Sequence, residues 1–282
     1  MIIMDINSLM SRHFHLRRWP LTPMPPPSVA SRLKMDTKLT PAAVKGFMSR
    51  VGGLNYLAVQ TRPDILFAVT SMSRRTHSAT LQDLEDVDRI FAYLAGTLHF
   101  GLKFHSGEGI VLYATVDASY ASHTDSKSHT GCTLHIGRLS ASFLTLSKKQ
   151  TITADSSTYA EFIAAHTATK QILWARNFLL ELGFPQLHPT SLFEDNMSTI
   201  QIVNQPGNNG RTKHIALRYN VIREQVERQI ITLQHLAGID MPSDLLTKAL
   251  GPAPFLHLRP RILGMYAMCT SPQSPPFSYY VR

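Results

Sequence analysis

The chain has 282 residues, of which 44% are hydrophobic and 17% charged, as is typical of a globular protein with one large domain or two ordinary ones. Its net charge is +9, from 28 Lys and Arg against 19 Asp and Glu, which favours an anionic partner, with nucleic acid first. Two cysteines are too few for a disulfide framework or a zinc site, and fit a reducing, intracellular compartment. No run approaches 18 apolar residues, so no membrane span or membrane partner is expected.

The first part of the chain changes character near residue 40. Residues 1–40 contain the proline-rich stretch PLTPMPPPS and are expected to be irregular. Over residues 41–104, apolar residues recur at helical spacing, for example at positions 84, 87, 90, 91 and 94. Pro41 suits the first turn of a helix, and Arg62-Pro63 marks a turn. We therefore expect a region of about three helices that is separable from the rest of the chain.

Strand patterns dominate from residue 105. The runs GIVLYATVDAS, HTGCTLHIGR and SASFLTLSKKQ predict an antiparallel meander. After it the patterns predict a helix at 156–183, a strand at 190–195, a helix near 196–204, a helix at 214–229, a strand at 230–236 and a helix at 241–250. This is an α/β order with a five-stranded mixed sheet flanked by helices, as in the ribonuclease H fold. We place this domain at residues 105–252 and expect a mostly irregular extension at 253–282.

Four acidic residues stand next to these predicted elements: Asp117, Glu161, Asp195 and Asp244. Carboxylates beside buried elements are costly unless something pairs with them, and divalent cations prefer oxygen ligands. Two such ions about 3.5–4 Å apart can cut a phosphodiester. Simpler interpretations exist. An Asp at a strand end often forms a turn, and Asp244 could favour a helix start, with Ser243 or Asp240 as the cap.

Six stretches in this order resemble the C-terminal part of copia-type LTR retrotransposon polyproteins: VGGLNYLAVQTRPDILFAV, VDASYASHTDSKSHTGCTLHIG, LSKKQTITADSSTYAEFIA, LFEDNMSTIQI, RTKHIALRYNVIREQV and SDLLTKAL. The resemblance implies a reverse transcriptase thumb and connection over 41–104. It also implies a ribonuclease H domain that degrades the RNA strand of RNA–DNA hybrids. The four carboxylates become the catalytic ligands of two Mg²⁺ ions, for which Mn²⁺ could substitute.

No pair of adjacent aspartates occurs in a strand–turn–strand setting, so no polymerase palm is expected among these residues. An upstream palm and fingers could be a partner, in a cytoplasmic virus-like particle or in the nucleus. One alternative is a decayed, inactive copy that only binds nucleic acid. Another is that the helices of 41–104 merely dock on a polymerase. In proteins of related fold, a histidine in the loop before the last Asp helps the product leave. His235 is a candidate for this role, but the simpler interpretation is an ordinary residue of the strand.

Loops and helix starts near the carboxylates carry candidate contacts for the hybrid. They are Ser128, His129, Thr130, Lys148, Lys149, Gln150, Ser157, Asn196, Arg211, Lys213 and His214. The alternative is ordinary solvated loop charge, or helix capping for the serines. Trp174 and Phe178, with Ile163, Ile172, Leu173 and Leu179, fit a core-facing helical stripe and are predicted to pack inside.

Overall fold

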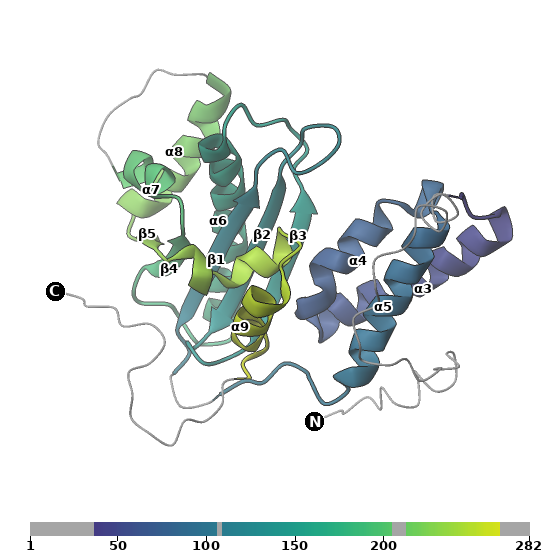
Figure 1. Cartoon of the computed structure of the whole chain (residues 1–282). Helices are drawn as coiled ribbons and strands as arrows, with labels where there is room; N and C mark the ends of the chain where they lie inside the picture. The colour runs from purple at the N-terminus through teal and green to yellow at the C-terminus, as the bar shows by residue number, and fades with distance from the viewer. Residues whose placement is uncertain (1–36, 106–108, 205–212, 266–282) are drawn as a thin grey trace.

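The computed structural model describes residues 37–105, 109–204 and 213–265, and its centre is a five-stranded sheet in the order β3-β2-β1-β4-β5 (Figure 1). The first three strands form the expected antiparallel meander, and β1, β4 and β5 run parallel to one another. The strands are β1 (Leu112–Ser119), β2 (His129–Ile136), β3 (Ser142–Lys149), β4 (Thr190–Glu194) and β5 (Ile231–His235). The sheet is the ribonuclease H-like fold that the order of patterns predicted.

The long helix α6 (Ser157–Glu181) packs against β1 and β2. Ser156 caps it, since its Oγ accepts a hydrogen bond from the backbone N of Tyr159. Small residues dominate its buried face and let the helix approach the sheet closely; they are Ala160, Ala164, Ala165, Ala168 and Ala175.

The prediction of a core-facing stripe on α6 is wrong at two positions. The side chains of Trp174 and Phe178 are 52% and 46% exposed, and their rings stack with centroids 5.6 Å apart. Ile163, Ile172 and Leu179 are buried as predicted, and Ala175 is buried with them, so the buried stripe passes beside the two aromatic residues and not through them. Periodicity alone does not distinguish these adjacent stripes, because an aromatic residue raises the apolar score wherever it lies.

The parallel half of the sheet comes after α6 in the chain. After β4 the chain forms α7 (Met197–Asn204) and α8 (Lys213–Glu227) before it returns as β5. Helix α8 packs against α6, and α7 packs against β5. β5 ends at His235, whose side chain is exposed and which pairs in register with Glu194.

The N-terminal helices lie to one side of the sheet (Figure 1). They are α3 (Pro41–Gln60), α4 (Leu66–Ser73) and α5 (Leu81–Gly96), with the 3₁₀ turns η1 (Pro63–Ile65) and η2 (Thr76–Ser78). Pro41 occupies the first turn of α3, as expected. Thr80 and Asp83 form a capping box at the start of α5. These features explain why α3 and α5 begin where they do.

Residues from the far end of the chain complete the core of these helices. Leu245 and Leu246 of η4 (Pro242–Leu246), with Leu258 and Ile262 of α9 (Pro252–Leu263), join the cluster that contains Phe47, Val51 and Leu94. A hydrophobic core shared in this way argues against the separable helical region expected from the sequence.

The expectation of a mostly irregular segment after 252 is wrong for α9. Prolines at 252, 254 and 260 obscured its pattern, although Pro252 is compatible with a first helical turn and three apolar side chains near the end are buried, namely Leu258, Ile262 and Leu263. Gly264 ends the helix in the left-handed conformation, and a Cβ there would collide with the backbone of Lys103 and Ala141. The helix predicted at 241–250 is instead the short η4. Within the described ranges no helix has the length and apolarity needed to cross a bilayer.

Candidate active site

Three of the four predicted carboxylates meet at one edge of the sheet. Asp117 lies on β1, Glu161 in the first turns of α6 and Asp195 directly after β4. One carboxylate oxygen from each lies within 4.8 Å of the others. β1 and β4 are parallel neighbours, so their ends reach the same edge, and α6 begins beside that edge. Asp117 and Glu161 are buried, and Asp195 is half-buried.

Burial makes this cluster electrostatically costly without a cation. Burial, together with the charges of Glu194, Asp117 and Asp195, raises the pKa of Glu161 to about 11. Burial and then Asp117 raise the pKa of Asp195. In addition, Oε2 of Glu161 is buried with no hydrogen-bond partner in the part of the chain that the structure describes. Crowded hard oxygen donors with an unsatisfied buried oxygen fit a divalent metal ion.

Glu194 is a member of this neighbourhood that the sequence interpretation missed. It is fully buried, and its Oε1 accepts a hydrogen bond of 3.2 Å from the backbone N of Asn196. Burial raises its pKa well above the usual range. The sequence contains a signal for it, because Glu194 ends an apolar strand directly before Asp195. Burial of an acid at such a position is costly unless the acid belongs to a site that pairs with it.

Asp244 lies beside the cluster and is held there by an ion pair. Lys248 Nζ lies 3.1 Å from Asp117 Oδ1 and 2.9 Å from Asp244 Oδ1. Thr247 Oγ1 also donates a hydrogen bond to Asp117 Oδ2. Burial and the charge of Asp117 raise the pKa of Asp244 to about 7. Although burial opposes it, the charges of Asp117 and Asp244 raise the pKa of Lys248. Sequence analysis did not single out Thr247 or Lys248.

A glycine allows η4 to come this close to β1. Gly131 on β2 pairs directly with Asp117. A Cβ on Gly131 would lie 2.7 Å from both the backbone O of Ser243 and Cγ2 of Thr247. Only a residue without a side chain fits there, so Gly131 allows Asp244, Thr247 and Lys248 to reach Asp117.

The predicted substrate contacts lie in several different environments. Four are buried and have no surface for a ligand in this structure: Ser128, His129, Thr130 and Gln150. Gln150 Nε2 donates to Thr130 Oγ1 and to the backbone O of Ala160, which indicates a structural role. Lys148 and Ser157 are exposed, Lys149 is half-buried, and Asn196 Oδ1 accepts from Thr199 N at the start of α7. Arg211 lies outside the described residues, as do the side chains of Lys213 and His214.

Known proteins resemble this chain over most of its length. It is 34% identical over 259 residues to the retrovirus-related Pol polyprotein from transposon RE1 of Arabidopsis thaliana, covering 91% of this chain and 17% of that protein. It is 34% identical over 248 residues to the Pol polyprotein from transposon TNT 1-94 of Nicotiana tabacum, covering 85% and 18%. The chain thus spans less than a fifth of the length of these relatives. Comparison with protein-family models finds no match.

Solved structures with a similar arrangement include LC11-RNase H1 in complex with an RNA/DNA hybrid. The TM-score is 0.38 at 10% identity, over 48% of this chain and 93% of that protein. A foamy viral protease-reverse transcriptase in complex with double-stranded DNA gives a TM-score of 0.40 at 10% identity, over 71% and 32%.

Proposed function

The chain belongs to the family of copia-type retrotransposon Pol polyproteins, and we propose that it cleaves the RNA strand of RNA–DNA hybrids by metal-dependent hydrolysis. The observation that carries this proposal is the convergence of three carboxylates, with oxygens within 4.8 Å of one another, on a ribonuclease H-like sheet. A buried acidic cluster has no stabilising role of its own, because like charges in a desolvated place repel. A chemical role therefore accounts for the cluster better than a structural one.

Asp117, Glu161 and Asp195 would hold divalent metal, with Asp244 as a ligand at the rim. Two Mg²⁺ ions are the proposed cofactors, and Mn²⁺ could substitute. When bound, such ions lower the proton affinity of the attacking water and stabilise the leaving 3′-oxygen.

The residues of this chain orient the site. Lys248 and Thr247 hold Asp117 from one side through the ion pair and the hydrogen bond described above. Lys248 also keeps Asp244 beside Asp117. Because Asp117 and Glu161 are buried, their oxygens keep a fixed spacing and are little hydrated. Pre-organised ligands of this kind reduce the cost of ordering the site around substrate.

The proposed substrate contacts are the accessible ones, Lys148, Lys149, Ser157 and Asn196, with Arg211, Lys213 and His214. Lys and Arg neutralise backbone phosphates, and small polar groups can contact the RNA 2′-hydroxyls. A reverse transcriptase palm and fingers upstream in such a polyprotein is the proposed protein partner.

Cleavage assays test the proposal directly. With Mg²⁺ or Mn²⁺, the full chain is expected to cut the RNA strand of a labelled hybrid and to leave duplex DNA of the same sequence intact. Asp195→Asn keeps the size of the side chain but removes charge from the cluster. It should lower cleavage by at least ~10³-fold while hybrid binding changes little. The matched control is Asp88→Asn on α5, a partner of Arg50 outside the acidic cluster. Binding of the hybrid without metal-dependent cleavage would support the inactive, nucleic-acid-binding alternative.

A further inference from the structure

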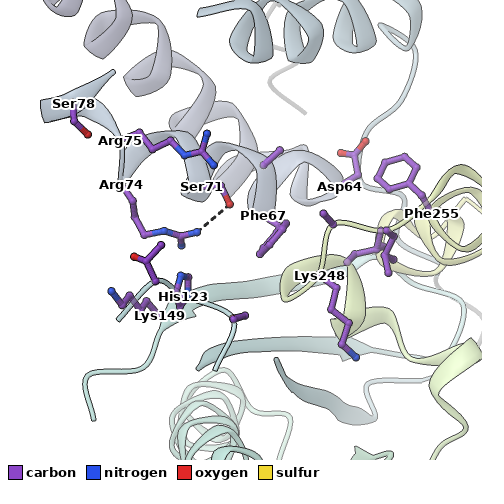
Figure 2. A pocket seen from close by; sticks show the side chains of 16 residues that line it. Asp64, Phe67, Ser71, Arg74, Arg75, Ser78, His123, Lys149, Lys248 and Phe255 are labelled. Carbon is purple, nitrogen blue, oxygen red and sulfur yellow. Dashed lines mark hydrogen bonds between the residues drawn. The ribbon is translucent and has the colours of Figure 1, made fainter. Parts of the chain in front are cut away.

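A cleft of about 890 Å³ separates the N-terminal helices from the sheet (Figure 2). We call it the α4 cleft. One wall includes Phe67 of α4 and Arg74, which directly follows that helix. The other wall includes His123 of the β1–β2 loop and Lys149 at the end of β3. Lys248 lies at its other end and connects it to the acidic cluster, since the Lys248 ammonium contacts Asp117 and Asp244. The cleft therefore runs from the candidate active site toward the helices.

Positive charge dominates the lining. It includes four cations and one carboxylate: Arg74, Arg75, Lys149 and Lys248 against Asp64. Arg62 neutralises Asp64 in a buried ion pair of 2.8 Å, and the hydroxyl of Tyr93 donates to the same carboxylate. The lining thus offers almost no free negative charge.

Of these four cations, Arg74 is the one with no counter-charge among the residues that the structure describes. Arg75 pairs with Asp83 at 2.7 Å, and Lys149 pairs with Asp125 at 2.7 Å on the exposed loop. Arg74 Nη2 donates only to Ser71 Oγ, at 3.1 Å, and no carboxylate of the described ranges lies within 4.0 Å of it.

Other basic groups gather around Arg74 and do not avoid it. Figure 2 places Arg74, His123 and Lys149 together at one end of the cleft. Burial and then the charges of Arg74 and Lys149 lower the pKa of His123. His123 Nε2 is 3.1 Å from His129 Nδ1, and His129 Nε2 is 2.8 Å from Ser147 Oγ, so this imidazole pair is held in place. Asp125 is the carboxylate that pairs with Lys149 here, and fixed basic groups with so little acid among them are suited to an anion.

From this geometry we infer that the α4 cleft binds the phosphodiester backbone of a nucleic-acid strand, with Arg74 as its principal cation and Lys149 beside it. Guanidinium suits phosphate because its planar donors can bind two oxygens at once. A backbone supplies one phosphate after another along its length, which fits a cleft that continues to the acidic cluster. The N-terminal helices thereby act as one wall of the substrate site. The identity of the strand as part of an RNA–DNA hybrid rests on the proposed function.

Binding measurements on the full chain test this site. The probe is a fluorescent RNA–DNA hybrid, bound by protein carrying Asp195→Asn so that cleavage does not consume it. Arg74→Ala should weaken binding on the order of 10-fold and flatten the log–log salt dependence by about 0.9. Arg74→Lys should retain part of the affinity, and Arg74→Glu should lose more than Arg74→Ala. The matched control is Arg89→Ala on α5, an exposed arginine that pairs with Asp86 and is not among the residues that line the cleft.

Two results would overturn the inference. One is an Arg74→Ala variant that binds the hybrid within twofold of the Arg89→Ala variant, with the same salt slope. The other is Arg74-dependent binding of polyglutamate without Arg74-dependent binding of the hybrid, which would indicate an acidic protein partner. Thermal melts of each variant identify any loss due to misfolding. The outcomes also separate the two proposals. Cleavage with Arg74-independent affinity removes the cleft site alone, and Arg74-dependent binding without cleavage removes the nuclease alone.

Discussion

Two buried groups of charges in this molecule are built in opposite ways. In the N-terminal helices, Arg62 forms two hydrogen bonds with Asp64, at 2.8 and 3.0 Å, and Tyr93 donates a third to Asp64. At the sheet edge, Asp117, Glu161 and Asp195 converge with one lysine at their border, and Oε2 of Glu161 is buried with no hydrogen-bond partner among the described residues. The first group is electrically complete, so a structural role explains it. The second is incomplete, and this difference makes it the candidate for metal binding and catalysis.

Deleting the N-terminal helices, which contain the paired charges, should cause the largest loss of stability. A chain that begins at Gly101 exposes Leu245, Leu246, Leu258 and Ile262, which the helices bury. At about 1.5–3 kcal/mol for each side chain, the loss is roughly 6–12 kcal/mol, comparable to the whole stability of a domain. We expect the truncated chain to lose its cooperative thermal melt by circular dichroism. A chain that begins at Thr37 keeps every one of these contacts and is the control. A cooperative melt of the Gly101 chain would restore the two separable units expected from the sequence.

Breaking the ion pair between Arg62 and Asp64 should destabilise the protein less than deleting the helices. Arg62→Ala leaves the Asp64 carboxylate buried without its cation, with an expected loss of about 3–5 kcal/mol in the free energy of unfolding. Arg89→Ala removes an exposed arginine and should cost less than ~1 kcal/mol. Urea denaturation measures both. The double variant Arg62→Met/Asp64→Leu should recover much of the loss, because no unpaired charge remains. If Arg62→Ala were as stable as the control, the charges would not be structural.

The contact between η4 and the sheet can be tested at Gly131. Gly131→Ala places a methyl group 2.7 Å from the backbone O of Ser243, and η4 must shift. We expect about 1–3 kcal/mol of destabilisation and a large loss of hybrid cleavage, because Asp244 and Lys248 move with η4. Gly53→Ala, in the middle of α3 with nothing within 4 Å, should instead be neutral or stabilise by up to ~1 kcal/mol. Full cleavage by Gly131→Ala would mean that the site tolerates movement of η4.

At Glu161 the sign of the expected change in stability, and not its size, shows whether the carboxylate is unpaired. Since burial raises the pKa of Glu161 to about 11, its contribution to stability without metal is fully present below the unfolded pKa of ~4.3 and is lost as pH rises toward 11. Gln cannot ionise. Without metal, Glu161→Gln should therefore be at least as stable as the natural chain at pH 7, and relatively more so at higher pH.

Binding of Mg²⁺ should distinguish the natural chain from Glu161→Gln in a second way. Saturating Mg²⁺ should raise the melting temperature of the natural chain and should not raise that of Glu161→Gln. At a Mg²⁺ concentration of about 100 times Kd, the expected stabilisation of the natural chain is about 2.7 kcal/mol. Glu181→Gln, at the exposed end of the same helix, should respond like the natural chain. Differential scanning fluorimetry with and without Mg²⁺ measures both effects. An equal rise in all three proteins would exclude Glu161 as a ligand.

The sequence by itself determined the fold class and three members of the acidic cluster. Periods of two and 3.6 residues report which local element forms, and the order of the elements determined where β1, α6 and β4 had to lie. The carboxylates Asp117, Glu161 and Asp195 meet because each lies beside one of these elements.

Only the tertiary structure decided which residues from distant segments touch. It brought Lys248 and Thr247 to Asp117 across Gly131, added Glu194 to the cluster, and completed the core of the helices with α9. It also moved Trp174 to the surface and buried Gln150. The physical reason is that periodicity encodes a residue's face within its own element. The approach of one element to another depends on side-chain volume and packing between segments that a linear pattern does not connect.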